Sequence, residues 1–330
     1  MSHPHQADPA PLFTAMQALD PQTPASVEPE TPRRRGGARP EPADAVSLCV
    51  LGSGSGGNSS LLRRGDDLLM VDAGFGPRTT FERMMQAGVD FASVRGVLLT
   101  HLDRDHFRPS WVRTLLTWRT PVWCHRWHAD ELAGHPKLAP LHAEGLVRPF
   151  GAAPFEPMNG VRASALMMQH DRQGTSAFRL EARGTGGRRV CVGYATDLGH
   201  APRSLVQHLA GVDLLCIEAN YDVNMTKTCA RPSFVNRRNL SDSGHLSNEQ
   251  SLEACRQIDA ASPHANPRKF VLLHRSTQCN HPTKVLRCFE AAPAIHKRTV
   301  LTEQRRRSAW HRVAALPPVK QAQLCLSVAG

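Results

Sequence analysis

The chain has 330 residues, of which 41% are hydrophobic, so it can bury a substantial core without relying on disulfides. Its apolar runs have the length of single strands and fall far short of the roughly 20 residues that cross a bilayer, so no transmembrane helix is predicted and no membrane partner is expected. The formal net charge of +11 favours an anionic partner, and nucleic acid is the obvious candidate.

The N-terminal segment, residues 1–44, is rich in Pro, Ala, Glu and Arg and has few β-branched residues. Such a composition cannot bury enough apolar surface to offset the entropy lost on ordering, so we expect this segment to be disordered. It lacks a basic stretch followed by an apolar stretch, so no secretory signal is predicted and a cytoplasmic location is expected.

A domain of short strands and helices is predicted from residue 45 to residue 301. Strands are expected at Val46–Leu51, Ser60–Arg63, Leu68–Asp72, Val97–Thr100, Val161–Met168, Ala177–Ala182, Val190–Ala195, Leu214–Glu218 and Phe270–His274. Helices are expected at Thr79–Ala87, Ser110–Trp118, Ser204–Leu209, Ser247–Ile258 and Pro282–Ala291. Strands that come first in hairpins and then alternate with helices indicate an α/β fold of layered sheets covered by helices.

A glycine-rich loop follows the first predicted strand. Gly52, Gly54 and Gly57 fit the spacing of a dinucleotide-binding loop, with Asp72 about 20 residues further on. That fold needs a helix in between, whereas the stretch Arg63 to Asp67 is typical of a hairpin turn. We therefore expect the glycines to let a substrate approach the catalytic groups closely, rather than to bind a dinucleotide.

The strongest chemical signal is the loop His101-Leu102-Asp103-Arg104-Asp105-His106, directly after the apolar run Val97 to Leu99. Four metal-capable side chains in six residues at a strand end favour a metal site. His101 and Asp103 can face one metal ion while Asp105 and His106 face a second. The alternative is a polar loop of unrelated residues, but buried His and Asp side chains need partners.

Three further candidates, His170, Asp197 and His274, each follow an apolar run of strand length. Residues at strand ends can gather on one edge of the sheets, where α/β folds usually place their sites. A single histidine at a strand end is more often an ordinary surface residue. Three such residues together with the loop favour a site with two metal ions.

The basic C-terminal segment, residues 302–330, is expected to be a loosely ordered tail, and its Arg305-Arg306-Arg307 run is either solvated or contacts nucleic acid. The nine cysteines are scattered and form no C-x-x-C pair, so we expect reduced thiols.

The loop at 101–106 resembles the H-x-H-x-D-H signature of the metallo-β-lactamase superfamily. The order of motifs along the chain resembles the bacterial YycJ/WalJ (VicX) branch of that superfamily. The matching stretches are Leu51 to Ser59, Val71 to Gly74, the metal loop, His170-Asp171, Ala195 to Gly199, Glu218 to Asn220, Gly244 to Asn248 and His274.

This resemblance implies a four-layer αββα sandwich with two divalent metal ions at one edge. By matching positions, the metal ligands would be His101, Asp103 and His170 for one ion, Asp105, His106 and His274 for the other, and Asp197 as the bridge. The implied activity is that of a metal-dependent phosphodiesterase or 5′-to-3′ DNA exonuclease, and a role in DNA repair is implied by the branch alone. The nucleophile would be a hydroxide bound to both metals and positioned by Asp105 and Asp197.

Other residues are assigned supporting roles. Asp72, Ser53 and Asn220 are expected to orient the ligands or contact substrate. His245, just before a predicted helix, is expected to contact a phosphate or protonate a leaving group, or else to pack at the helix entry.

The sequence departs from the family pattern at two positions. Asp103 stands where the family usually has its second histidine, and an oxygen ligand makes manganese or iron plausible beside zinc. Tyr221 stands where the branch commonly has histidine. Two alternatives to the nuclease therefore stay open: a metallo-hydrolase for a lactone, thioester or β-lactam, and a non-catalytic nucleic-acid-binding protein.

Overall fold

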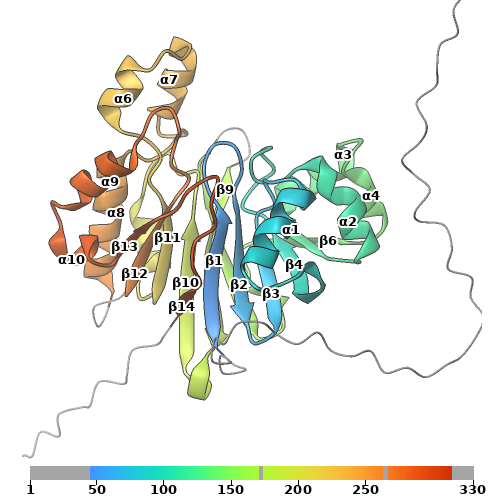
Figure 1. Cartoon of the computed structure of the whole chain (residues 1–330). Coiled ribbons are helices and arrows are strands. Elements are labelled where there is room, and N and C mark those ends of the chain that lie inside the picture. The colour runs from blue at the N-terminus through green and yellow to red at the C-terminus, as the bar shows by residue number, and fades with distance from the viewer. Residues whose placement is uncertain (1–44, 171–173, 263–266, 314–330) are drawn as a thin grey trace, which may run out of the picture. The chain divides into compact units, whose positions relative to one another are not determined.

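The computed structural model describes residues 45–170, 174–262 and 267–313. The predicted disordered segment 1–44 lies outside these residues. Within them, two seven-stranded sheets pack face to face, and helices cover the outer face of each sheet (Figure 1). The predicted α/β class with a four-layer αββα sandwich is confirmed.

The first sheet begins antiparallel and becomes parallel. Its strands, in spatial order, are β14 (His311–Val313), β1 (Val46–Gly52), β2 (Ser59–Arg64), β3 (Asp67–Val71), β4 (Val94–Leu98), β5 (Val122–His125) and β6 (Val147–Phe150). Strands β2 and β3 form an antiparallel hairpin that turns at Gly65, whose φ of 58° suits glycine. The predicted hairpin is therefore present where a dinucleotide fold would need a helix. From β3 to β6 all pairs are parallel.

The second sheet has the same plan. Its strands, in spatial order, are β13 (Thr299–Leu301), β12 (Lys269–Leu273), β11 (Leu214–Glu218), β10 (Arg189–Ala195), β9 (Thr175–Arg183), β8 (Val161–Met168) and β7 (Phe155–Met158). Strands β10 to β13 are parallel to one another, and β7 to β10 are antiparallel. Because β8 and β10 both pair antiparallel with β9, they run in the same direction and end at the same edge.

The helices flank the two sheets in two groups. They are α1 (Pro77–Gln86), α2 (Val112–Thr117), α3 (Arg126–Gly134), α4 (Ala139–Ala143), α5 (Arg203–Leu209), α6 (Val223–Thr228), α7 (Ser233–Asn239), α8 (Asn248–Ala261), α9 (Pro282–Phe289) and α10 (Pro293–His296), with short 3₁₀ turns at Phe91–Ser93, Pro109–Trp111 and Thr185–Gly187. Helices α1 to α4 lie beside the first sheet, and α8 to α10 beside the second (Figure 1). None of the described helices is both long and apolar enough to cross a bilayer.

Strand β1 shows how the alternating pattern serves two of the three apolar layers. Its residues Leu48 and Val50 point into the apolar layer between the sheets, while Cys49 and Leu51 point into the layer beneath the helices. This alternation follows from the two-residue period of a strand. The third apolar layer lies between the second sheet and helices that include α5, α8 and α9.

The C-terminal boundary differs from the expected one. Of the predicted tail, residues 302–313 are part of the folded domain, because β14 pairs antiparallel with β1 and Ser308 N donates to Val50 O. Within this segment Arg305 and Arg306 are exposed. The remainder of the predicted tail, residues 314–330, lies outside the described residues.

Candidate metal centre

The candidate ligands and Asp72 lie just beyond the C-terminal ends of strands that meet at one edge of the sandwich. Asp72 follows β3, the metal loop follows β4, and His170 follows β8. Asp197 follows β10, and His274 follows β12. The strands therefore carry ligands that lie far apart in the sequence to a common edge.

Three site residues have a left-handed backbone conformation. Asp72, Asp197 and His274 have φ values of 59°, 57° and 52°, and each stands just beyond a buried strand. Such conformations cost about 1–3 kcal/mol for non-glycine residues, and they cluster at functional sites where the surrounding structure holds them. The chain turns sharply at these points, which directs each side chain into the site.

The seven predicted ligands come together in overlapping groups. The atoms of His101, Asp103 and His170 lie within 4.8 Å of one another, as do those of Asp105, His106 and His274. Asp197 joins His101 and His106 in a third such group, and its Oδ2 lies 3.0 Å from His106 Nε2. The geometry thus fits the expected division into two sets with Asp197 between them, while the role of each residue as a ligand stays a prediction.

Each of the four histidines has its Nδ1 atom engaged by the protein. His106 Nδ1 donates to Asp72 at 2.8 Å, His170 Nδ1 to the Gly244 carbonyl at 3.0 Å, and His274 Nδ1 to Glu218 at 3.0 Å. His101 Nδ1 lies 3.0 Å from Thr100 Oγ1, whose own proton goes to Asp72.

These contacts decide which ring nitrogen faces the site. A histidine that donates from Nδ1 presents its Nε2 lone pair, and partners of this kind both orient a metal ligand and make it more basic. His274 Nε2 accordingly lies 3.2 Å from Asp105 Oδ2, and His170 Nε2 lies 3.8 Å from Asp197 Oδ1.

The buried carboxylates and histidines of the site shift one another's pKa values. Burial raises the pKa of Asp197, but the charges of His274 and His106 outweigh it and hold that pKa well below its usual range. Burial lowers the pKa of His274, but Asp197, Asp105 and Glu218 outweigh it and raise that pKa to about 10. The raised pKa values of His274 and His106 favour protons on these rings, and a divalent cation bound here would replace those protons.

His101 shows that the residues fit a metal ion. Burial and the neighbouring charge of His106 lower the pKa of His101 well below its usual range, so its ring stays neutral. Its Nε2 atom is buried and has no hydrogen-bond partner among the described residues. The nearest carboxylate oxygen, Asp103 Oδ2, is 3.8 Å away. A neutral nitrogen left without a partner beside carboxylates suits a divalent cation.

The other predicted site residues lie around this centre. Ser53 Oγ accepts from His274 N at 2.8 Å, and Asn220 Nδ2 donates to His274 O at 2.7 Å. Both are buried and hold the turn at His274. The His245 ring lies near those of His170 and His274, with centroid distances of 5.3 and 5.1 Å. His245 therefore borders the centre, although it also precedes α8.

The glycine loop has a different role from the expected one. A Cβ atom on Gly52 would lie 2.2 Å from Arg83 Nη1, and one on Gly57 would lie 2.6 Å from the Phe75 ring. The prediction that these glycines give room to a substrate is therefore corrected, because the space beside them is filled by the protein itself. Gly74 makes a similar close approach, since its Cβ atom would lie 1.7 Å from the Asp105 carbonyl oxygen.

Sequence reasoning missed two buried residues of the site. Glu218 forms a further ligand-like group with Asp197, His245 and His274. It ends the apolar strand β11, the same signal that identified the other candidates. Thr100 was included in a predicted strand, but its hydroxyl joins Asp72 to the metal loop, and no sequence pattern indicates that contact.

Comparison with known proteins agrees with this geometry. Residues 68–274 match the model of the β-lactamase superfamily domain. The exodeoxyribonuclease YycJ of Bacillus anthracis is 27% identical over 218 residues, which are 64% of this chain and 77% of that protein. The exodeoxyribonuclease WalJ of Streptococcus pneumoniae is 27% identical over 214 residues, 62% of this chain and 74% of that protein.

A solved structure gives the same fold. The metallo-β-lactamase fold protein YhfI from Bacillus subtilis superposes with a TM-score of 0.57 at 16% identity, covering 80% of this chain and 99% of YhfI. At this identity the likeness establishes the fold alone. Since the family match spans more than half of the chain and includes most of the ligand groups, the chain belongs to the β-lactamase superfamily and is a hydrolase of the metallo-β-lactamase fold.

Proposed function

We propose that this hydrolase is a metal-dependent phosphodiesterase that shortens DNA from the 5′ end and uses two divalent metal ions. The observation that carries the proposal is the convergence of seven metal-capable side chains into two adjoining sets with Asp197 between them. The similarity to two proteins named exodeoxyribonucleases supports DNA as the substrate. The net charge of +11 supports a polyanionic substrate as well.

The residues would hold the ions in two sets. His101, Asp103 and His170 would hold one ion, Asp105, His106 and His274 the other, and Asp197 would contact both. Bound divalent ions lower the pKa of a water molecule and neutralise charge on the phosphodiester oxygens. Asp103 contributes a hard oxygen ligand and its side chain is 48% exposed, so manganese or iron suits this set as well as zinc.

His245 is the proposed general acid. Its Nδ1 atom lies 2.7 Å from Glu218 Oε1, and its side chain is 16% exposed, so the ring borders both the buried carboxylate and the solvent side. With Nδ1 held by Glu218, Nε2 is the ring nitrogen left to face the substrate, and a proton on it would pass to the oxygen that leaves when the phosphodiester bond breaks.

The experiment that tests the proposal combines metal analysis with DNA cleavage. Metal content is measured by elemental analysis, and wild type and Asp105→Ala are assayed on single- and double-stranded DNA labelled at the 5′ or the 3′ end. We expect about two metal ions per chain, early release of the 5′ label, and no cleavage by Asp105→Ala with its fold retained. Asp67→Ala, which removes an aspartate that pairs with Arg95 far from the centre, is the matched control.

Other outcomes would redirect the assignment. Bound metal without cleavage of any nucleic acid would favour a small-molecule hydrolase. Absence of metal, with no affinity for any, would favour a non-catalytic nucleic-acid-binding protein. Cleavage by a metal-replete Asp105→Ala protein would contradict the role given to Asp105.

A further inference from the structure

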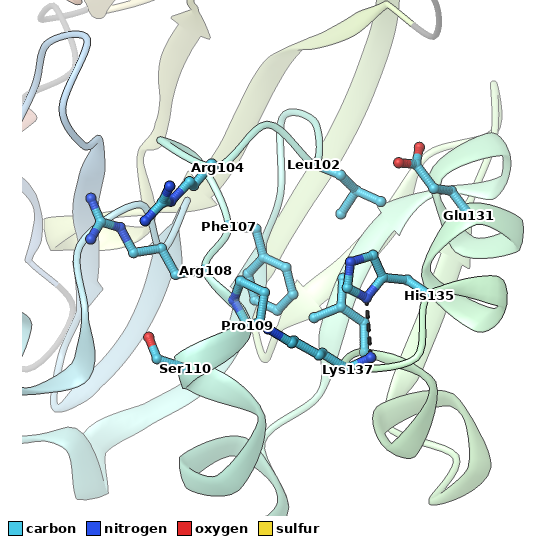
Figure 2. Close-up of a pocket in the computed structure, with 10 residues that line it drawn as sticks. Leu102, Arg104, Phe107, Arg108, Pro109, Ser110, Glu131, His135 and Lys137 are labelled. Carbon is cyan, nitrogen blue, oxygen red and sulfur yellow. Dashed lines mark hydrogen bonds between the residues drawn. The ribbon is translucent and has the colours of Figure 1, made fainter.

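A cleft of about 710 Å³ opens beside the metal loop. One side is formed by the loop and the residues that follow it, and the other by α3 and the turn after it. Figure 2 shows Leu102 and Phe107 from the first side facing His135 from the second. None of the candidate ligands lines the cleft, but Leu102 and Arg104 of its wall alternate along the metal loop with Asp103 and Asp105, so a substrate bound in it would lie against the flank of the metal loop.

The charges of the cleft favour an anion. Arg104, Arg108 and Lys137 line it, against the single carboxylate of Glu131. The Arg108 guanidinium is already committed, because it donates to the carbonyl groups of Gly74 and Gly56. Arg104 and Lys137 are exposed, and neither side chain makes an ion pair within the described chain. Two cationic side chains are thus free to contact phosphate groups.

An exposed aromatic ring stands on the helix that forms the second side. Trp127, in the first turn of α3, is 51% exposed, and it lies four residues before Glu131, so the two share one face of the helix. Its ring packs against His125 with a centroid distance of 4.7 Å and an interplanar angle of 78°, an edge contact that leaves ring surface open. Since β5 and β4 are parallel, the start of α3 lies at the same edge as the metal loop.

We propose that this cleft, together with Trp127 on the adjoining face of α3, binds a single-stranded stretch of the polynucleotide near the bond that is cleaved, with a base stacked on Trp127 and phosphates held by Arg104 and Lys137 in the cleft. This rests on the proposed function and names the form of substrate that the centre takes. A positively charged groove combined with an exposed aromatic ring is the usual means of binding single strands without sequence preference. A paired base in a duplex has no free face for such a ring.

Binding is tested apart from cleavage. Metal-loaded wild type is titrated with a fluorescent single-stranded oligothymidine whose phosphorothioate linkages resist hydrolysis, and binding is followed by fluorescence anisotropy. We expect Trp127→Ala to weaken binding about 5- to 150-fold, because stacking of one base contributes about 1–3 kcal/mol to the binding free energy. Trp118→Ala is the matched control, because Trp118 is 52% exposed and packs on Phe91 outside the cleft.

The charges are tested by the dependence of affinity on salt. Each lost phosphate contact lowers the slope of log affinity against log salt by about 0.7 for single strands. We expect that reduction in Lys137→Glu, and tighter binding in Glu131→Gln. Arg104→Glu is informative only beside Lys137→Glu, because Arg104 is flanked by candidate ligands. Arg78→Glu, which alters an exposed arginine on α1, should leave the slope unchanged.

The outcomes separate this inference from the proposed function. If Trp127→Ala and Lys137→Glu bind the oligonucleotide as well as their controls do, the cleft assignment is overturned, whatever the wild type cleaves. If wild type binds a duplex of the same length more tightly than the single strand, the single-strand assignment is overturned. If the variants lose affinity but wild type cleaves no nucleic acid, the cleft assignment stands and the proposed nuclease activity fails.

Discussion

The buried carboxylate of Glu218 offers a sharp test of how the site is oriented. All its partners are hydrogen-bond donors. Its Oε2 atom accepts from Leu198 N at 2.8 Å and Leu246 N at 3.2 Å, and its Oε1 atom lies 2.7 Å from His245 Nδ1 and 3.0 Å from His274 Nδ1. A carboxylate can accept from all four, whereas a glutamine at this position must direct its own NH₂ group at two of them.

Glu218→Gln should therefore weaken metal binding more than its small change in shape suggests. If the amide NH₂ faces the histidines, His274 must accept at Nδ1 and carry its proton on Nε2, where it can no longer serve as a ligand. Loss of a partner of this kind typically lowers metal affinity 10- to 100-fold, which is about 1.4–2.8 kcal/mol. If the NH₂ faces the backbone instead, the stability loss should be about 1.5–3 kcal/mol per lost hydrogen bond.

The assay is a metal titration against a competing chelator, together with urea unfolding of the same samples. Asp213→Asn is the matched control, since Asp213 is a buried carboxylate that accepts from Cys191 N at 2.8 Å outside the centre. It should lose stability while its metal affinity stays unchanged. A Glu218→Gln protein with the metal affinity and the stability of wild type would refute the tautomer argument.

Two further predictions concern charge and packing. The folded-state pKa of His274 is raised to about 10 and that of His106 is also raised, so their stabilising effect is complete below the unfolded value of about 6.5 and is lost as pH rises through the folded values. The melting temperature of the chelated protein should accordingly fall as pH rises from about 6.5 towards 10, and a flat profile would contradict the assignment. Gly74→Ala would place a Cβ atom 1.7 Å from the Asp105 carbonyl oxygen and should cost about 1–3 kcal/mol of the free energy of unfolding in urea, together with metal affinity. Gly134→Ala, at the end of α3 with nothing within 4 Å of its added Cβ atom, should instead be neutral or stabilising, and equal effects at the two positions would show that the close approach at Gly74 is unimportant.

The residues that gather at the candidate centre could be predicted because their signals are local. An apolar run in the sequence predicts a buried strand, and a polar residue directly after such a run is a candidate site residue. His170, Asp197 and His274 were all found in this way. Glu218 also comes at the end of an apolar run. Because it is itself the last residue of β11, it is predicted as part of the strand and not as a polar residue that follows it. Its importance lies in contacts with His245 and His274, which come from elsewhere in the chain.

The elements that the sequence did not predict are short or depend on distant partners. Strands β5 and β6 have four residues each, too few for an alternating pattern to stand out. Strand β14 has three residues within a basic segment, and it forms because it pairs with β1 at the other end of the domain. Composition alone made this segment resemble a tail, because local patterns carry no information on long-range pairing.

The centre is shared between the two sheets, and this has an energetic consequence. The metal loop comes from the first sheet, whereas Asp197, Glu218 and His274 come from the second. When no ion is bound, contacts such as that of His106 with Asp197 join the two sheets, and they require buried histidines to hold protons. A divalent ion would replace those protons and bind atoms of both sheets in the folded state only, so its binding energy adds directly to the free energy of unfolding. Metal binding should therefore stabilise the sandwich as a whole and not the loop alone, and the added stability should grow as pH rises, because fewer protons then have to be displaced.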